Sequence, residues 1–439
     1  MKRVAAAFVV LLVTRSASAG VEDTFGLGPA PMALGGSYAA RPGDSAAAYY
    51  NPAGLAPWGH KKEHGGFFEL TLGAIYAHPT LHVTGSRGQE LTTPEVPDTA
   101  GVLLGTRFSV GQPFHVDGLD MGVSLFVPKG LFQWSIRPDD DVQWALLTDR
   151  TQVVSAHVGL AYRVAPWLSL GLGLRISFGV QTLTRGQVTS VGLATDPQTG
   201  TTVVRTSTVL GTDAEVFGRV TPLVGVLLTP IDPVRIGLVY RHKSYVDDWG
   251  NTRISGVPDL GDMGYTHHYA HYFEPSEVTA AASVDVGGGF DLSFDLTYAR
   301  WSEALSTGRN FYGDGRWGDT WTPAFGARWR AHPGFALLSG YRFQKSPLDN
   351  LSGPTNLLDN DRHVLSLGFE VDFGKLFHTP SVDARLTFGL AAVSLVPRTE
   401  TKDFQRFVSD DAMLRNPGYP SYSYGGQVLA TSTAVEAKW

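Results

Sequence analysis

Hydrophobic residues alternate with polar or small residues at every second position through most of the chain. The clearest run covers 168–180. Its apolar face consists of Leu168, Leu170, Leu172, Leu174, Ile176, Phe178 and Val180, and Ser, Gly and Arg fill the other face. Because successive side chains of a strand point to opposite faces, this pattern predicts a β-strand with one apolar face. The run is also longer than the roughly 9–11 residues that a strand needs to cross a membrane.

The same alternation recurs along the chain and predicts about 14 strands. They lie near 66–84, 99–110, 118–131, 152–164, 168–184, 203–228, 232–248, 276–287, 288–300, 319–331, 334–345, 361–373, 379–397 and 423–439. Short turns, such as 165–167, alternate with long loops, such as 132–151 and 249–275. Outer-membrane barrels have this arrangement, with the short turns in the periplasm, whereas a soluble β-sandwich gives no reason for it. We therefore expect an all-β fold, a transmembrane antiparallel β-barrel over 66–439.

Aromatic residues gather near the ends of the predicted strands. Those toward the long loops are Tyr240, Tyr298, Trp301, Trp321, Tyr341 and Phe343, and those toward the short turns are Trp167, Trp329 and Trp439. Aromatic side chains with a polar tip prefer the level of the lipid headgroups, so these two sets predict the two girdles of a membrane barrel.

The N-terminal segment has the features of a secretory signal. Lys2 and Arg3 precede an unbroken apolar run over 4–13, and the small residues Ala17-Ser18-Ala19 follow. This order predicts a signal peptide over 1–19 that is removed on export. Together with the barrel, it places the protein in the outer membrane of a Gram-negative bacterium.

Residues 20–65 do not alternate and are rich in Gly, Ala and Pro. Small residues allow close backbone packing in a confined space, so we expect this segment to form a plug, or hatch, in the barrel lumen. The string Asn51-Pro52-Ala53 predicts a turn, because Asn favours turns and Pro fixes φ while offering no N–H.

Composition narrows the function classes. The 439 residues include 35 Lys+Arg, 41 Asp+Glu and no cysteine, with a net charge of -6. This balance does not suit a polybasic nucleic-acid binder, and the lack of cysteine excludes thiolate metal sites and catalytic thiols. The sequence also lacks a nucleophile elbow, a P-loop and a dinucleotide fingerprint, so we expect no enzyme and no cofactor. His267, His268 and His271 favour a solvated loop over a metal site because no carboxylate partners are visible.

Several strings resemble the FadL/TodX family of outer-membrane transporters for long-chain fatty acids and hydrocarbons. The matching strings are Met32-Ala33-Leu34-Gly35-Gly36, Asn51-Pro52-Ala53-Gly54-Leu55 and Trp317-Gly318-Asp319-Thr320-Trp321. The resemblance implies a 14-stranded barrel closed by an N-terminal hatch. We expect the hatch or gating residues to be Gly35, Gly36, Asn51, Pro52, Ala53 and Gly54. The expected function is passive uptake of a hydrophobic small molecule, by a protein that we expect to be a monomer. Members of the wider family also serve as scaffolds or secretion partners, so the alternative function is a non-transport barrel that acts as an outer-membrane scaffold or secretion partner.

Further residues are candidates for the steps of such uptake. Two loops carry apolar residues for capture of the ligand: Phe132, Trp134, Trp144 and Leu147 in one, and Tyr265, Tyr269 and Phe273 in the other. Arg175, Arg241 and Arg342 face the predicted lumen and are candidates for an anionic headgroup. Pro222 lies within a predicted membrane strand, where it removes a ladder donor, so we expect a bulge or gap there that faces the plug. The expected partners besides the ligand are membrane lipid and lipopolysaccharide.

Overall fold

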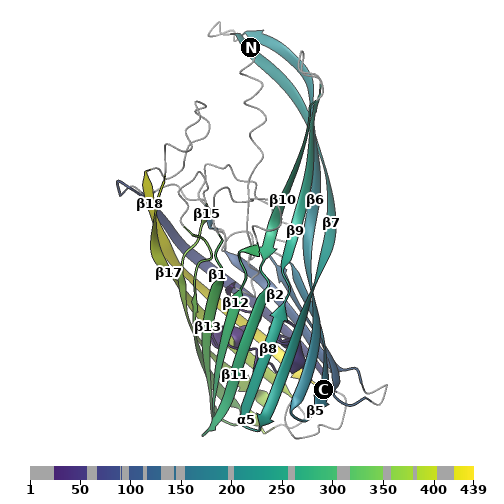
Figure 1. Cartoon of the computed structure of the whole chain (residues 1–439), viewed down its shortest axis with the longest axis vertical. Helices are drawn as coiled ribbons and strands as arrows, with labels where there is room; N and C mark the ends of the chain where they lie inside the picture. Colours follow the sequence, from purple (N-terminus) through teal and green to yellow (C-terminus); the bar gives the residue numbers. More distant parts are fainter. Residues whose placement is uncertain are drawn as a thin grey trace.

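The computed structural model shows a closed barrel whose strands continue into long hairpins at one end (Figure 1). It describes residues 24–56, 67–88, 90, 98–111, 116–129, 143–144, 154–195, 202–255, 263–303, 317–349, 357–378, 383–402 and 420–439. Among these residues, no helix combines the length and apolar character needed to cross a membrane.

Fourteen antiparallel strands close the barrel, in the order β1-β2-β3-β5-β6-β7-β8-β11-β12-β13-β14-β16-β17-β18, and β18 pairs back with β1. Their bounds are β1 (Phe68–Gly85), β2 (Thr99–Ser109), β3 (Leu119–Pro128), β5 (Ser155–Ala165), β6 (Leu168–Thr195), β7 (Thr202–Ile231), β8 (Val234–Arg241), β11 (Glu277–Gly287), β12 (Phe290–Ala299), β13 (Thr320–His332), β14 (Phe335–Gln344), β16 (Arg362–Asp372), β17 (Ala384–Thr401) and β18 (Ser421–Lys438). The predicted all-β barrel of about 14 strands is confirmed.

The largest departure from the predicted strands lies around 185–275. β6 runs on to Thr195, and its hairpin with β7 rises far above the rest of the barrel (Figure 1). Where a loop is expected over 249–275, the chain instead forms β9 (Ser244–Ser255) and β10 (Met263–Glu274), which pair with each other. β9 also pairs in parallel with the upper part of β6. Loops rich in Thr, Val and Tyr favour such extended pairing because these residues suit a pleated surface.

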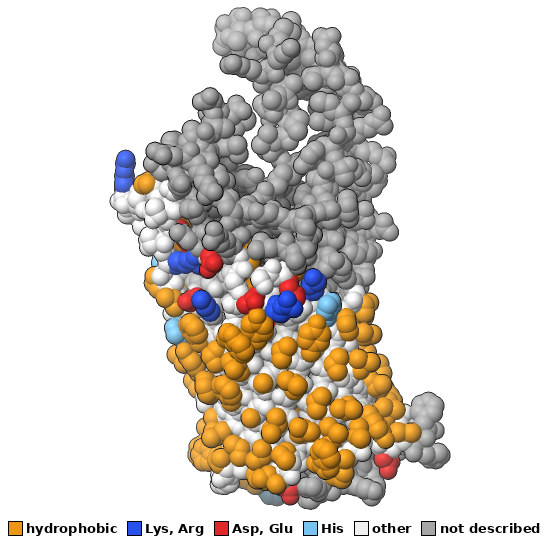
Figure 2. All heavy atoms as spheres, viewed as in Figure 1, with side chains coloured by type: hydrophobic (Ala, Val, Ile, Leu, Met, Phe, Trp, Pro, Cys, Tyr) orange, Lys and Arg blue, Asp and Glu red, His pale blue; other side chains and the backbone are white. Residues whose placement is uncertain are grey.

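The outer face of the barrel carries an apolar band with a belt of Lys, Arg, Asp, Glu and His just above it (Figure 2). Side chains in the band are open to lipid: Leu365 and Leu367 of β16 are 63% and 62% exposed. The girdle aromatics Trp321, Trp167 and Trp439 are also exposed. Trp301 is the exception and corrects our expectation, because it is buried and stacks on Trp317 with ring centroids 5.3 Å apart.

A segment of short helices fills the lumen between Thr24 and Ala56. Its helices are α2 (Pro29–Ala33), α3 (Ala47–Tyr50) and the 3-10 helix η2 (Pro52–Leu55), and nearly every residue of the segment is buried. α2 packs on β14, β16, β17 and β18, whereas α3 and η2 pack on β3, β5, β6 and β7. We refer to residues 24–56 as the plug.

Candidate functional site: the plug and the wall at β7 and β8

One strand of the wall anchors the middle of the plug. Asp295 of β12 is buried and accepts hydrogen bonds from the backbone N–H groups of Tyr38 (3.0 Å) and Ala39 (2.9 Å). The same carboxylate accepts a third hydrogen bond from the Ser37 hydroxyl at 3.1 Å. On the same face of β12, Asp291 binds Arg41 of the plug at 2.7 Å. Charge-assisted hydrogen bonds are stronger than neutral ones, so this strand anchors the middle of the plug.

The turn that the sequence predicts at Asn51 also binds the wall. The Asn51 side chain is fully buried and caps η2 by accepting a hydrogen bond from the Ala53 N–H at 3.1 Å. Its amide donates to the backbone oxygen of Ala39 at 2.8 Å. It also donates to the backbone oxygen of Val226, on β7, at 3.2 Å. Asn51 therefore joins two parts of the plug to β7.

Glycines on the lumenal face of ten strands make room for the plug. At each of these glycines, an added Cβ would come close to an atom of the plug. The glycines are Gly105, Gly122, Gly159, Gly171, Gly225, Gly237, Gly326, Gly340, Gly368 and Gly389. A Cβ on Gly171 would lie 2.1 Å from the Ala53 nitrogen, and one on Gly225 would lie 2.1 Å from the Asn51 Oδ1. This set of glycines is visible in the sequence only as glycine at the polar positions of the alternation, and it was not among the predicted site residues.

Two of the expected hatch residues, Gly35 and Gly36, adopt positive φ of 65° and 89°. A Cβ on Gly35 would lie 2.8 Å from the Tyr341 nitrogen of β14, so this position combines a left-handed backbone with a close approach to the wall. Gly54 leaves no room for a side chain for a different reason: an added Cβ would overlap the Pro42 ring inside the plug. These contacts give the small residues of the plug a packing role.

The barrel wall is interrupted beside Pro222, but not in the way the sequence suggested. β6 and β7 pair in regular register through 219–225, so no bulge is present on that side. The Pro222 side chain is exposed on the outer face and does not face the plug. The ladder between β7 and β8 ends at Leu223–Arg241, followed by one hydrogen bond from the His242 N–H to the Pro222 oxygen at 3.1 Å. Beyond this point the ribbon of β9 and β10 turns toward β6, so the gap lies between β7 and β8.

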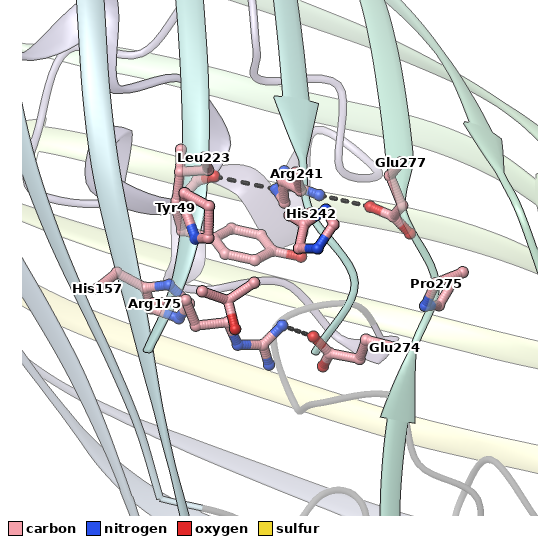
Figure 3. Close-up of a pocket in the computed structure, with 11 residues that line it drawn as sticks. Tyr49, His157, Arg175, Leu223, Arg241, His242, Glu274, Pro275 and Glu277 are labelled. Atoms are coloured by element: carbon pink, nitrogen blue, oxygen red, sulfur yellow. Dashed lines mark hydrogen bonds and ion pairs between the residues drawn. The ribbon is translucent and has the colours of Figure 1, made fainter. Parts of the chain in front are cut away.

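A small pocket lies just inside this gap (Figure 3). Its lining includes Pro222 and Leu223 of the wall, Tyr49 of the plug, and the ends of β8, β10 and β11. The pocket volume is about 20 Å³, which is enough for roughly one water molecule. A guest larger than water therefore fits this pocket only if the plug or the paired strands β9 and β10 move.

The polar side chains of this pocket are paired. Arg241 binds Glu277 at 2.7 Å and lies over the Tyr49 ring, with its guanidinium carbon 4.2 Å from the ring centroid. Arg175 of β6 forms a buried ion pair with Glu274 at the end of β10. Figure 3 shows the two pairs on opposite sides of the Tyr49 ring. The third headgroup candidate, Arg342, is part of another site and donates to the Thr24 backbone oxygen at 2.6 Å.

The capture loops are described only in part. Phe132, Trp134 and Leu147 lie outside the described residues. Trp144 forms the two-residue strand β4 (Gln143–Trp144), which pairs with β15 (Leu357–Leu358), and Tyr265 and Tyr269 are in β10. Phe273 is buried against Trp301, with ring centroids 6.2 Å apart. Phe273, Trp301 and Trp317 thus form an aromatic cluster, which we call the mouth cluster.

The other end of the lumen is strongly charged. A cavity of about 610 Å³ opens there. Its charged lining consists of Arg328, Arg330, Lys375, Arg385, Glu370 and Asp372. Arg328 binds Glu370 at 2.6 Å, and Lys375 binds Asp372 at 2.5 Å. The lumen therefore has an aromatic cluster beside paired charges at its outer end and a charged cavity at its lower end.

Comparison with known proteins agrees with this architecture. A family model described as outer membrane protein transport protein (OMPP1/FadL/TodX) matches residues 9–406. Alkane uptake protein A of Marinobacter nauticus is 23% identical over 398 residues, which cover 85% of this chain and 83% of that protein. A Pseudomonas aeruginosa FadL homologue has a similar structure, with a TM-score of 0.54 and 16% identity over 98% of this chain and 99% of the other. The P. putida toluene transporter TodX gives a TM-score of 0.55 and 15% identity over 94% and 98%.

Proposed function

This chain belongs to the OMPP1/FadL/TodX family of outer membrane transport proteins, and from that premise we propose that it takes up small hydrophobic molecules passively. The ligand enters through the outer loops, rests beside the plug and leaves when the plug moves. The observation that carries the proposal is the pocket that joins the plug turn at Tyr49 to the gap between β7 and β8. A barrel that served only as a scaffold has no need for a gap aligned with its plug.

The exit that we propose is sideways through this gap. An apolar chain gains about 0.8 kcal/mol for each CH₂ removed from water, and it gains nothing comparable beside ionic groups. Both ends of the lumen carry ionic groups, so this gain is largest where the ligand passes directly out of the wall. At the gap, Leu223 faces inward and Pro222 lies on the outer face, so the path from the pocket to the outside of the wall is short.

Capture at the outer end is assigned to the mouth cluster and to the loops around it. Phe273, Trp301 and Trp317 are each 5% exposed or less and pack on one another, so a guest reaches these rings only when the cluster opens. Stacked aromatic rings favour apolar and aromatic guests. Phe132, Trp134, Trp144, Leu147, Tyr265 and Tyr269 remain proposed capture residues.

We also propose that the outer rim contacts lipopolysaccharide. Tyrosines on the outer face hydrogen-bond to polar groups nearer the loops: Tyr76 to Asp98 (2.5 Å), Tyr298 to Asp319 (2.6 Å), Tyr240 to His242 (2.9 Å) and Tyr341 to His363 (2.8 Å). A ring with an apolar body and a bonded polar tip suits the boundary between acyl chains and headgroups. The belt of charged side chains in Figure 2 lies at this level.

A disulfide between the plug and the wall tests the proposed movement. Ser45 of the plug donates to the Thr71 hydroxyl of β1 at 3.2 Å, and the chain has no cysteine of its own. In the double variant Ser45→Cys/Thr71→Cys, we expect uptake of radiolabelled hexadecane by whole cells to fall to background when oxidised and to return on reduction. The single variant Thr71→Cys is the control. Full uptake with the crosslink formed contradicts gating by the plug, and no uptake by the wild type favours the scaffold role.

A further inference from the structure

The charges around the pocket at the wall gap balance one another. Arg175 and Arg241 bring two positive charges, and Glu274 and Glu277 bring two negative charges. The Arg175–Glu274 pair is almost fully buried, and the Arg241–Glu277 pair is 14% and 19% exposed. Buried charges are tolerated when they are paired, so this arrangement is stable only while the pocket receives no further charge.

Arg241 already has a carboxylate partner. Its Nη1 donates to the Glu277 carboxylate at 2.7 Å, and its Nε donates to the Tyr49 backbone oxygen at 3.3 Å. Its face lies over the Tyr49 ring. A carboxylate that binds Arg241 would therefore lie beside the Glu277 carboxylate, and two anions that share one guanidinium in a confined site repel each other.

The two histidines of the pocket also have other contacts. His157 is fully buried and packs edge-on against the Tyr49 ring, with centroids 4.9 Å apart. The Nδ1 of His242 shares a hydrogen bond with the Tyr240 hydroxyl on the outer face. A fatty-acid anion thus finds its candidate cations engaged, whereas an uncharged hydrophobic molecule disturbs no pair.

From this balance we propose that Glu274 and Glu277 make the channel select uncharged hydrophobic molecules over fatty-acid anions. This inference rests on the proposed transport function and names its substrate class. The two glutamates act as specificity residues by occupying the arginines that a carboxylate headgroup needs. Arg175 and Arg241 are then parts of the closed wall, and neither is a headgroup site in the wild-type protein.

The test compares hexadecane with palmitate, which share a carbon chain length and differ in the carboxylate. In a Gram-negative host without its own channels for hydrophobic compounds, we expect the wild type to raise hexadecane uptake and to leave palmitate near the vector background. Glu277→Gln keeps the shape and releases Arg241, so the ratio of palmitate to hexadecane uptake should rise on the order of tenfold, the effect of one charge-assisted hydrogen bond. Glu274→Gln should act in the same direction through Arg175.

Two controls separate this effect from a general change in charge. Glu370→Gln removes the same charge from the Arg328–Glu370 pair at the other end of the lumen and should leave the ratio unchanged. Adding Arg241→Gln to Glu277→Gln should abolish the gain. Equal uptake of both probes by the wild type, or an equal gain in Glu370→Gln, overturns the inference.

A binding measurement keeps the inference testable apart from transport. Calorimetry on the purified, folded barrel should show that Glu277→Gln binds palmitate about tenfold more tightly than the wild type does. Unchanged affinity in a correctly assembled variant overturns the selectivity role. Absence of hexadecane uptake by the wild type, with the affinity gain present, contradicts the transport function and leaves the selectivity of the pocket supported.

Discussion

The barrel wall is built differently on its two sides at the outer end. On one side β17 and β18 pair from Ala384–Ala437 up to Thr401–Ser421, with one irregularity. Behind them Tyr424 donates to Glu400 at 3.1 Å, and Asn360 donates to the backbone oxygens of Val396 and Tyr424. On the other side the ladder between β7 and β8 stops at Leu223–Arg241. A continuous ladder with a hydrogen-bonded network behind it resists opening, whereas an interrupted ladder gives a place where the wall yields.

The plug follows the same division. Helix α2 packs on β14, β16, β17 and β18, which form the continuous side, and α3 and η2 pack on β3, β5, β6 and β7, next to the gap. Asp295 holds Tyr38 and Ala39 between these two halves. We therefore expect α3 and η2 to move about this anchor and open the pocket without releasing α2. One half of the barrel would then stay fixed while the other yields.

The largest expected effect comes from closing the gap. Pro222 and His242 face each other at the end of the ladder, joined by one hydrogen bond at 3.1 Å. Facing residues of antiparallel strands have Cα atoms about 4.5–5.5 Å apart, within the range of a disulfide. We expect Pro222→Cys/His242→Cys to lose hexadecane uptake when oxidised and to recover it on reduction.

The matched control places the same crosslink in the continuous wall. Ala392 of β17 faces Leu429 of β18, and both side chains are exposed on the outer face. Ala392→Cys/Leu429→Cys should transport equally well in both redox states. If uptake survives the crosslink at Pro222, the ligand leaves by another route and the two sides do not differ in function.

Removing the anchor should free both halves of the plug. Asp295→Ala deletes the acceptor of three hydrogen bonds, from Ser37, Tyr38 and Ala39. Hydrogen bonds to a charged group contribute about 1.5–3 kcal/mol each, so the plug should open often while the ladders of β12 keep the barrel intact. Cells should become sensitive to large hydrophilic antibiotics, and Asp295→Asn, which keeps one oxygen, should show a smaller effect. A tight outer membrane in Asp295→Ala contradicts the anchor.

A weaker effect is expected from the half of the plug beside the gap. Asn51→Ala removes bonds to Ala39 and Val226 and leaves these buried oxygens without that donor. Such a loss costs about 1–3 kcal/mol, enough to change hexadecane uptake several-fold. Pro52→Ala, which keeps the bonds of Asn51, should change uptake less. Normal uptake by assembled Asn51→Ala reduces this turn to a packing element.

Much of the fold follows from local pattern, and the site follows from contacts between distant residues. The period of two along 168–180 predicts strand, face and membrane span together, because one alternation fixes all three. The same pattern does not predict where the ladder between β7 and β8 ends. That point depends on the pairing of β9 with β10 and with β6. The alternation predicts that Arg241 faces the lumen as a headgroup candidate. Its partner Glu277 is its neighbour across the strands and is not visible from spacing alone.

The smallest expected effect concerns the outer rim, where the two sides also differ. Tyr240, beside the gap, bonds to His242, whereas Tyr76, on β1, bonds to the Asp98 carboxylate at 2.5 Å. Hydrogen bonds from the Tyr76 hydroxyl and the His78 ring lower the pKa of Asp98. An acid whose pKa is lowered on folding stabilises the fold above its unfolded pKa of about 3.9, and this contribution disappears as the pH falls through the folded pKa. Tyr76→Phe should therefore melt slightly below the wild type at pH 7, and the difference should vanish in strong acid. Thermal unfolding in detergent at pH 7 and in strong acid measures this difference in melting temperature. Tyr240→Phe is the control, because Tyr240 bonds to a histidine and not to a carboxylate. An equal difference for Tyr76→Phe at both pH values contradicts the role of Asp98.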